Sequence, residues 1–187
     1  MPEAPLLSPI SPSFSWQGPG LEMVFESDLE VVCLRLGRQE SPERAAQVLG
    51  GALPSARTFV RYRTVEIAWL GPREWLLMGR DLGPVIGGLR DAYADGLALV
   101  TDVTHASAPF VLSGPSARAA LSAHCPLDIA DHAFPKGASA RSLLGEAGVF
   151  VARLPDGEAG HPCFRLIVDQ TLADYAVRMI RPREGVI

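Results

Sequence analysis

The sequence is poor in cysteine, and the few that it has are not arranged as a disulfide or metal framework. Cys33, Cys125 and Cys163 are widely separated in a chain of 187 residues, their number is odd, and no C-x-x-C pair occurs. A disulfide-stabilised scaffold is therefore excluded. We expect three small, buried, apolar thiols in a reducing cytoplasm.

The chain also lacks an excess of positive charge and any long apolar run. Its 17 Lys and Arg against 21 Asp and Glu give a formal net charge of −4, which argues against a general nucleic-acid-binding protein. No stretch approaches the roughly 20 apolar residues that cross a bilayer. Residues 1–16 have no basic segment followed by an apolar run, as a signal peptide would. We expect a soluble, cytoplasmic chain that binds neither membrane nor nucleic acid.

Glycine is frequent, yet it does not form a nucleotide-binding fingerprint. No G-x-G-x-x-G occurs, and Gly83 to Gly88 has the wrong spacing and falls inside a predicted helix. No phosphate-binding loop and no nucleophile elbow are present either. We therefore expect no dinucleotide cofactor, no metal and no catalytic residues on this chain.

What the sequence does have, first, is a proline- and serine-rich start. Residues 1–22 contain five prolines, which remove backbone donors and predict an extended or disordered arm outside the folded domain. The arm also carries the apolar residues Leu6, Leu7, Ile10, Phe14 and Trp16. It is therefore either a solvated terminus or a segment that binds a partner.

From residue 23 onward, the pattern predicts a single α+β domain made of two similar halves, at about 23–96 and 97–187. The first half reads as strand, helix, hairpin and helix at residues 31–36, 42–49, 64–78 and 82–94. The second half repeats this order at residues 97–112, 115–123, 148–168 and 172–180. We expect an internal duplication, with mostly antiparallel sheets and helices packed on them.

Two polar clusters are candidate sites. Asp102-Val103-Thr104-His105 follows an apolar strand and could bind a ligand, but Asp and Thr at such a place also form turns by bonding nearby backbone amides. We favour the turn. The second cluster, His124, Cys125, Asp128 and His132, meets no standard zinc spacing, so we interpret it as a connection.

Many short motifs together resemble one family. They are Gly71-Pro72-Arg73-Glu74-Trp75-Leu76-Leu77, Asp102-Val103-Thr104-His105, Leu112-Ser113-Gly114-Pro115, Cys125-Pro126-Leu127-Asp128, Phe134-Pro135-Lys136-Gly137, Arg141-Ser142-Leu143-Leu144, Phe164-Arg165-Leu166 and Ala173-Asp174-Tyr175. In this order and spacing they resemble the gamma subunit of heterotetrameric sarcosine oxidase, over nearly the whole chain.

The resemblance implies the fold of the folate-binding domain of the glycine-cleavage T-protein, and membership of an enzyme that oxidises sarcosine to glycine with tetrahydrofolate and oxygen. It also implies alpha and beta subunits as partners, with delta as a further candidate, and it places FAD, FMN, NAD and tetrahydrofolate on those partners. Whether the isolated chain self-associates stays open. Only Asp102, His105 and Arg141 are candidates for a cofactor contact on this chain.

Three alternatives stay open at this stage. The chain could be a stand-alone aminomethyltransferase, although such enzymes are about twice as long. It could be a folate-binding maintenance protein, although the cysteine-containing motif of those proteins is absent. It could also be the equivalent subunit of a related N-methyl amino acid dehydrogenase, because the substrate is chosen on another chain.

Overall fold

The computed structural model describes residues 10–181, which divide into two compact units. The central unit contains Asp28–His105 and Gly137–Ala140. Among the described residues, the terminal unit contains 10–27, Ala106–Lys136 and 141–181. Within the described part of the chain, no helix is long and apolar enough to cross a membrane.

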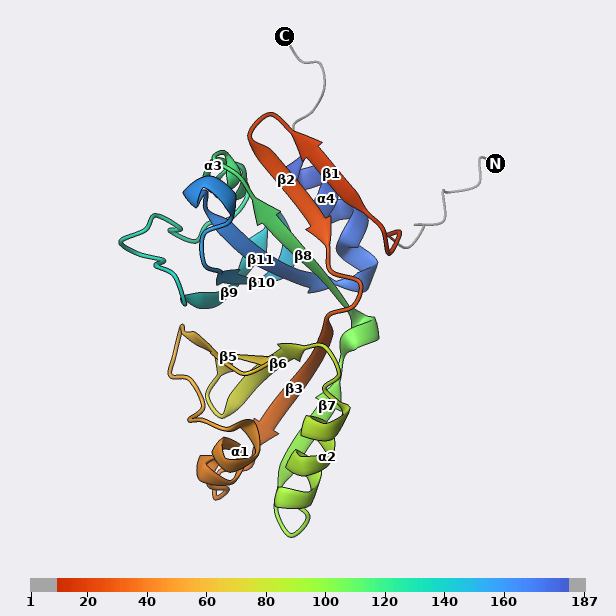
Figure 1. The fold of residues 1–187 in the computed structure, drawn as a ribbon, viewed down its shortest axis with the longest axis vertical. Helices are drawn as coiled ribbons and strands as arrows, with labels where there is room; N and C mark the ends of the chain where they lie inside the picture. Colours follow the sequence, from red (N-terminus) through yellow and green to blue (C-terminus); the bar gives the residue numbers. More distant parts are fainter. Residues whose placement is uncertain (1–9, 182–187) are drawn as a thin grey trace. The chain divides into compact units, whose positions relative to one another are not determined.

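The central unit is a five-stranded antiparallel sheet with two helices (Figure 1). The strand order is β4-β5-β6-β3-β7. Along the chain its elements are β3 (Glu30–Leu36), α1 (Pro42–Leu49), β4 (Phe59–Tyr62), β5 (Val65–Gly71), β6 (Glu74–Gly79), α2 (Gly83–Ala92), β7 (Ala98–Asp102) and the short 3-10 helix η1 (Thr104–Ala106).

The first helix of this unit has the ends that its sequence predicts. The side chain of Ser41 accepts a hydrogen bond from the backbone N–H of Glu43, and Pro42 occupies the first turn. Gly50 ends α1 in the left-handed conformation, at φ 78°. The hydroxyl of Tyr93 accepts from the N–H of Ala45 and donates to the carbonyl of Ser41. It thereby takes the place of the first hydrogen bond of the helix.

The core of the central unit lies between α1, α2 and one face of the sheet. Its buried residues come from the strands and from both helices, and Trp75 also donates its indole N–H to the carbonyl of Pro54 at 3.0 Å. They are Val32, Leu34, Leu36, Ala45, Leu49, Val65, Ile67, Trp75, Leu77, Leu82, Leu89 and Tyr93. Both helices therefore pack on the sheet by an apolar stripe along one face.

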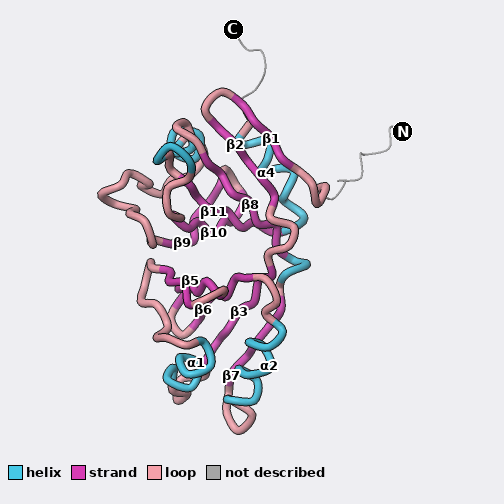
Figure 2. The backbone as a smooth tube through the Cα atoms, viewed as in Figure 1, coloured by secondary structure: helices cyan, strands magenta, loops and turns pink. Residues whose placement is uncertain are grey.

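The terminal unit is a six-stranded sheet in the order β1-β2-β8-β11-β10-β9. Its elements are β1 (Ser15–Gly18), β2 (Leu21–Phe25), β8 (Ser107–Ser113), α3 (Ala117–Ser122), β9 (Ser139–Leu144), β10 (Ala147–Arg153), η2 (Glu158–Gly160), β11 (Cys163–Asp169), η3 (Gln170–Leu172) and α4 (Ala173–Ile180). Figure 2 shows that strands dominate both units and that the helices are few and short.

The antiparallel sheets with helices packed on them confirm the predicted α+β class, and the two sheets also share one strand order. Read from one edge, β7-β3-β6-β5-β4 in the central unit corresponds to β2-β8-β11-β10-β9 in the terminal unit. The expected halves at residues 23–96 and 97–187 are not the compact units, however. β2 precedes β3 in the chain but pairs with β8, and β7 precedes β8 but pairs with β3. The first strand of each sequence half therefore belongs to the sheet formed mainly by the other half. An origin by duplication stays a prediction.

The predicted arm at residues 1–22 is too long. Ser15–Gly18 is a strand whose residues pair with Leu21–Val24, and Phe14 packs edge-on against Phe110 at 6.2 Å. The high proline content concealed this hairpin, because Pro12 and Pro19 flank the strand without interrupting its ladder. The part of the arm at residues 1–9, which includes Leu6 and Leu7, lies outside the described residues.

Candidate functional site

Asp102 and Thr104 form a turn at the end of β7. A carboxylate oxygen of Asp102 accepts the backbone N–H of Thr104 at 2.9 Å. The hydroxyl of Thr104 in turn accepts the N–H of Val31 at 3.0 Å. Hydrogen bonds from the side chain and backbone of Thr104 lower the pKa of Asp102. The turn that we favoured from the sequence is confirmed, and it fastens the end of β7 to the start of β3.

The three residues predicted as cofactor contacts are not gathered in one unit. His105 is exposed in η1, directly after the turn, and Asp102 is also exposed. Arg141 is exposed on β9 and belongs to the terminal unit. None of the three lines the cavities described below. Their role toward a cofactor stays a prediction.

The polar atoms around His124 are used locally. Cys125 is buried, with its sulfur 3.4 Å from the hydroxyl of Ser142. The carboxylate of Asp128 accepts the N–H of Ala130 and lies 3.7 Å from the ring of His132. Within residues 10–181, no group of three or more His, Cys, Asp or Glu side chains has the arrangement of a metal site.

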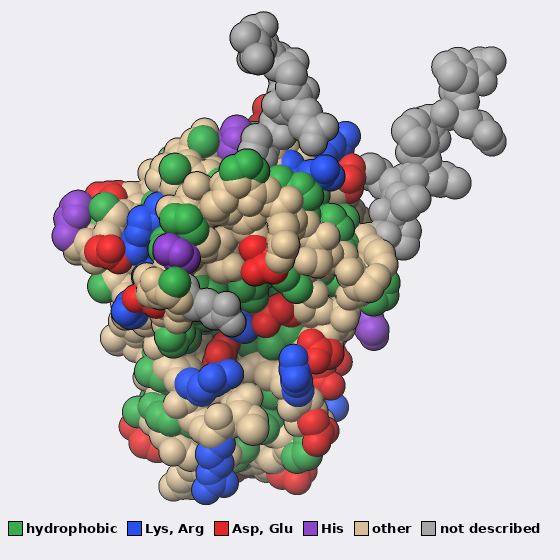
Figure 3. Space-filling view, turned by 45° about the horizontal axis from the view of Figure 1, so that its top comes forward, with side chains coloured by type: hydrophobic (Ala, Val, Ile, Leu, Met, Phe, Trp, Pro, Cys, Tyr) green, Lys and Arg blue, Asp and Glu red, His purple; other side chains and the backbone are tan. Residues whose placement is uncertain are grey.

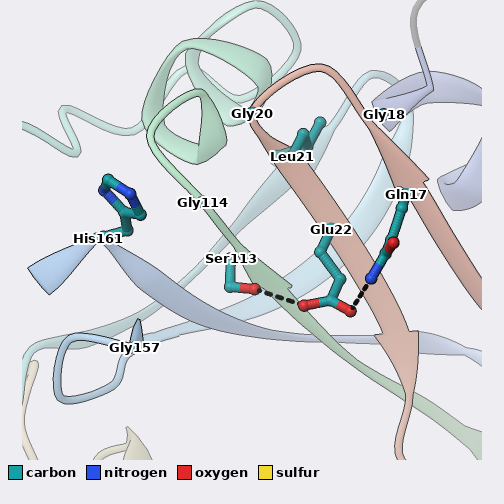
Figure 4. Close-up of a pocket in the computed structure, with 9 residues that line it drawn as sticks. All are labelled: Gln17, Gly18, Gly20, Leu21, Glu22, Ser113, Gly114, Gly157 and His161. Atoms are coloured by element: carbon teal, nitrogen blue, oxygen red, sulfur yellow. Dashed lines mark hydrogen bonds between the residues drawn. The ribbon is translucent and has the colours of Figure 1, made fainter. Parts of the chain in front are cut away.

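A pocket of about 310 Å³ lies in the terminal unit, between the turn of the β1–β2 hairpin, the end of β8 and the loop before β11 (Figure 4). The carboxylate of Glu22 is among the polar groups that line it. The amide of Gln17 donates to one of its oxygens at 2.9 Å, and the hydroxyl of Ser113 donates to the other at 3.4 Å. His161 also lines the pocket, but no hydrogen bond among the described atoms joins it to Ser113. The pocket is thus a hydrogen-bonded carboxylate in a recess and holds no serine–histidine pair.

Glycine is required on the wall of this pocket by the approach of two backbones. Gly114 has φ 118°, and a Cβ built there would lie 2.4 Å from the carbonyl oxygen of Gly20. That carbonyl accepts the N–H of Ser116 at 2.9 Å, which anchors the hairpin to the start of α3. The motif Leu112-Ser113-Gly114-Pro115 is therefore explained by chain packing.

A second feature of the terminal unit is an aromatic ring in contact with two guanidinium groups. Arg118 and Arg153 lie over the ring of Phe164, at 5.4 and 5.3 Å from its centre. Arg153 is only 2% exposed and donates to the carbonyls of Leu154 and Cys163. This cluster stabilises the end of β10 and the start of β11.

Carboxylates balance the charge of these arginines. Arg118 pairs with Asp131, and Arg153 pairs with Asp156, which also lies 2.5 Å from the ammonium group of Lys136. The hydrogen bonds from Lys136 and Arg153 lower the pKa of Asp156. Nearby, burial raises the pKa of the Cys163 thiol. These ionic groups hold one another and the backbone, and sequence reasoning missed them because the partners come from separate elements.

An apolar groove of about 460 Å³ is the largest of the cavities described. It lies along α3 and the end of α4, over small residues such as Ala120 and Ala123 and beside Arg178 and Arg181. Arg178 pairs with Asp174 at 3.1 Å, and Arg181 lies over the ring of Trp16 at 5.6 Å.

On the face of the molecule in Figure 3, basic and acidic side chains are interspersed, without the continuous basic surface that nucleic acid would need.

Comparison with known proteins gives evidence on fold and family that the contacts within the chain do not give. The chain is similar in fold to a chain of the heterotetrameric sarcosine oxidase from Corynebacterium sp. U-96, with a TM-score of 0.78 and 20% identity over 89% of this chain and 85% of that one. It is also similar to the glycine cleavage system aminomethyltransferase T from Bartonella henselae, with a TM-score of 0.61 and 12% identity over 86% of this chain and 45% of that one. No curated protein sequence matches.

Family assignment rests on the sequence itself. The model of the sarcosine oxidase gamma subunit family matches residues 41–182. This span begins at the N-cap of α1 and extends past the end of α4, so it includes most of both units. The chain therefore belongs to the sarcosine oxidase gamma subunit family.

Proposed function

We propose that this chain is the non-catalytic gamma subunit of a heterotetrameric sarcosine oxidase, bound to larger alpha and beta subunits. The observation that carries the proposal is the family match over residues 41–182. The fold similarity to a chain of a heterotetrameric sarcosine oxidase agrees with it. In this proposal the complex demethylates sarcosine to glycine, and FAD, FMN, NAD and tetrahydrofolate bind to the larger chains.

The contacts of the described polar groups support a structural role. Asp102 bonds its own turn, Glu22 is held between Gln17 and Ser113, and Arg153 is occupied by backbone carbonyls and Asp156. Side chains committed in this way are positioned to hold a fold together. Acid–base chemistry instead requires a group within hydrogen-bond reach of a substrate.

The test is to express the chain alone and together with the two larger subunits. We expect the isolated chain to be colourless and to form no hydrogen peroxide from sarcosine. We expect the co-expressed chains to purify together as a coloured complex that does form it. A flavin absorbance band on the isolated chain, or peroxide formation by it, would refute the non-catalytic role. Failure of the chain to purify with the larger subunits would refute the assignment to the complex.

A second candidate is a folate-binding protein, because the fold is also that of the T-protein. The present chain spans less than half of that protein, and fold alone does not carry function. Titration of the isolated chain with tetrahydrofolate separates the two candidates. Binding that is lost on replacing Asp102, His105 or Arg141 would favour the folate-binding protein.

A further inference from the structure

The sheet of the central unit ends at a strand that is open to further pairing. β7 is the outermost strand on its side, next to β3 and beside α2 (Figure 1). Leu97, directly before the strand, is 78% exposed, and Leu99 within it is 59% exposed. These are the two most exposed large hydrophobic side chains among the described residues. Natural proteins usually protect such an edge with charge, proline, a bulge or a covering segment.

The other three outermost strands of the two described sheets carry such protection. β4 contains Arg61, and just before it Thr58 forms a bridge with Ala138. β1 has only four residues and is followed by Pro19. β9 contains the exposed Arg141. In contrast, β7 reads Ala-Leu-Val-Thr-Asp, with its one charge at the last position.

The register of β7 shows which backbone groups are available for a new strand. Gly37 donates to the carbonyl of Leu97, and Val103 donates to the carbonyl of Val31. In an antiparallel ladder these pairs alternate, so Leu97, Leu99 and Thr101 direct their backbone groups toward β3. The N–H and C=O groups of Ala98 and Val100 consequently point away from β3, toward the open edge.

The side chains along this edge form an apolar recess. Leu97 and Leu99 lie on the face opposite Ala98 and Val100, which pack against the core. A cavity of about 310 Å³ lies beside them, lined by Leu36, Ala98 and the backbone of two glycines. On the face that carries Leu99 lies its pairing partner Arg35, which is 64% exposed and 3.3 Å from Glu74. The edge thus offers backbone donors and acceptors, two leucines and a cation.

We propose that β7 pairs with an extended segment of a larger subunit, which adds a sixth strand to this sheet. The segment would carry apolar side chains at alternate positions, to cover Leu97 and Leu99, and a carboxylate that faces Arg35. This inference rests on the proposed function, because family membership in a heteromeric enzyme indicates that the occupant is a different chain. An exposed apolar edge on a subunit that works in a complex is explained when that edge is buried in the complex.

Two substitutions test the side-chain and backbone parts separately, in the complex with both larger subunits. Leu99→Lys places a charge in the apolar contact. Ala98→Pro removes an N–H that points to the open edge and leaves the bonds of β7 to β3 in place. The matched control is Leu143→Lys, since Leu143 is a 47% exposed leucine on the edge strand β9 of the other unit. Circular dichroism and thermal melting of each isolated variant verify the fold.

We expect Leu99→Lys and Ala98→Pro each to weaken binding to the larger subunits at least tenfold, and Leu143→Lys to bind as the unsubstituted chain does. If the unsubstituted chain purifies with the larger subunits and both β7 variants bind equally well, the inference is wrong while the proposed function stands. An equal loss of binding to the larger subunits with Leu143→Lys would also overturn the inference. So would a homodimer of the isolated chain that Leu99→Lys separates without affecting binding to the larger subunits, because a second copy would then be the occupant.

Discussion

Breaking the ion pair between Glu26 and Arg165 should destabilise the terminal unit strongly. Arg165 on β11 donates to the Glu26 carboxylate through two nitrogens, at 2.6 and 3.0 Å. Its side chain is 7% exposed and that of Glu26 is 21% exposed. Glu26 follows β2, the strand that comes from the other half of the sequence, and its N–H donates to the carbonyl of Pro109. The pair therefore holds β2, the exchanged strand, on the sheet of the terminal unit.

The expected cost follows from the burial of the guanidinium. Glu26→Gln removes the Glu26 carboxylate from a buried guanidinium, and removing one partner of a buried ion pair typically costs about 3–5 kcal/mol. Because Glu26 is partly exposed, we expect about 2–4 kcal/mol, which corresponds to a fall in Tm of roughly 4–16 °C for a chain of this size. The double variant Glu26→Leu/Arg165→Met should be more stable than Glu26→Gln alone, since it removes the buried guanidinium together with the carboxylate.

Urea unfolding followed by far-UV circular dichroism measures these differences in unfolding free energy. If the slope of that free energy against urea concentration is unchanged, the denatured state is unaltered. The matched control is the pair of Arg80 and Asp28 in the central unit, at 2.8 Å with side chains 76% and 57% exposed. Asp28→Asn should cost less than about 1 kcal/mol, because exposed pairs are screened by water. If Glu26→Gln costs no more than Asp28→Asn, the pair does not stabilise the exchanged strand and the reasoning is refuted.

Three further outcomes follow from single side chains. Tyr93→Phe should lower stability by about 1–3 kcal/mol in thermal melts, since it leaves the N–H of Ala45 and the carbonyl of Ser41 without the bridging hydroxyl; an unchanged Tm would contradict this. Asp156→Asn should destabilise the protein at neutral pH. The difference in stability between the two proteins should vanish as the pH falls through the lowered pKa of Asp156, because the carboxyl of the unsubstituted protein is then protonated and uncharged too. A difference in stability that persists in acid would contradict this. In a mildly alkaline buffer, the half-buried Cys33 should react with a thiol reagent before Cys163, whose pKa is raised by burial; early labelling of Cys163, located by peptide mapping, would contradict it.

Periodicity and end signals were sufficient to predict most elements of the fold. Ser41, Pro42 and Gly50 mark α1 by local chemistry alone, and α4 is marked by its apolar stripe. Strands β2 and β4 were missed because their own apolar patterns are short, at five and four residues. A strand of four or five residues has too few alternations to be distinguished from a loop.

The exchange of β2 and β7 could not be predicted for a different reason. Either strand could pair with the strand that follows it in the chain, and the sequence pattern is the same in both cases. The pocket around Glu22 was missed for a related reason. Gln17 and Glu22 meet only through the β1–β2 hairpin, and Ser113 comes from β8. By contrast, the turn at Asp102 and Thr104 is made by adjacent residues and was therefore predictable.

The residues that carry the family resemblance hold the chain in place. Arg73, in the Gly-Pro-Arg-Glu motif, has φ 63° in the β5–β6 turn, and its guanidinium donates to the carbonyls of Leu36 and Glu40. Gly114 allows two backbones to approach, and Arg165 holds the exchanged strand. These three residues, from three of the motifs, therefore act on the fold: each holds or admits backbone at a turn or between strands.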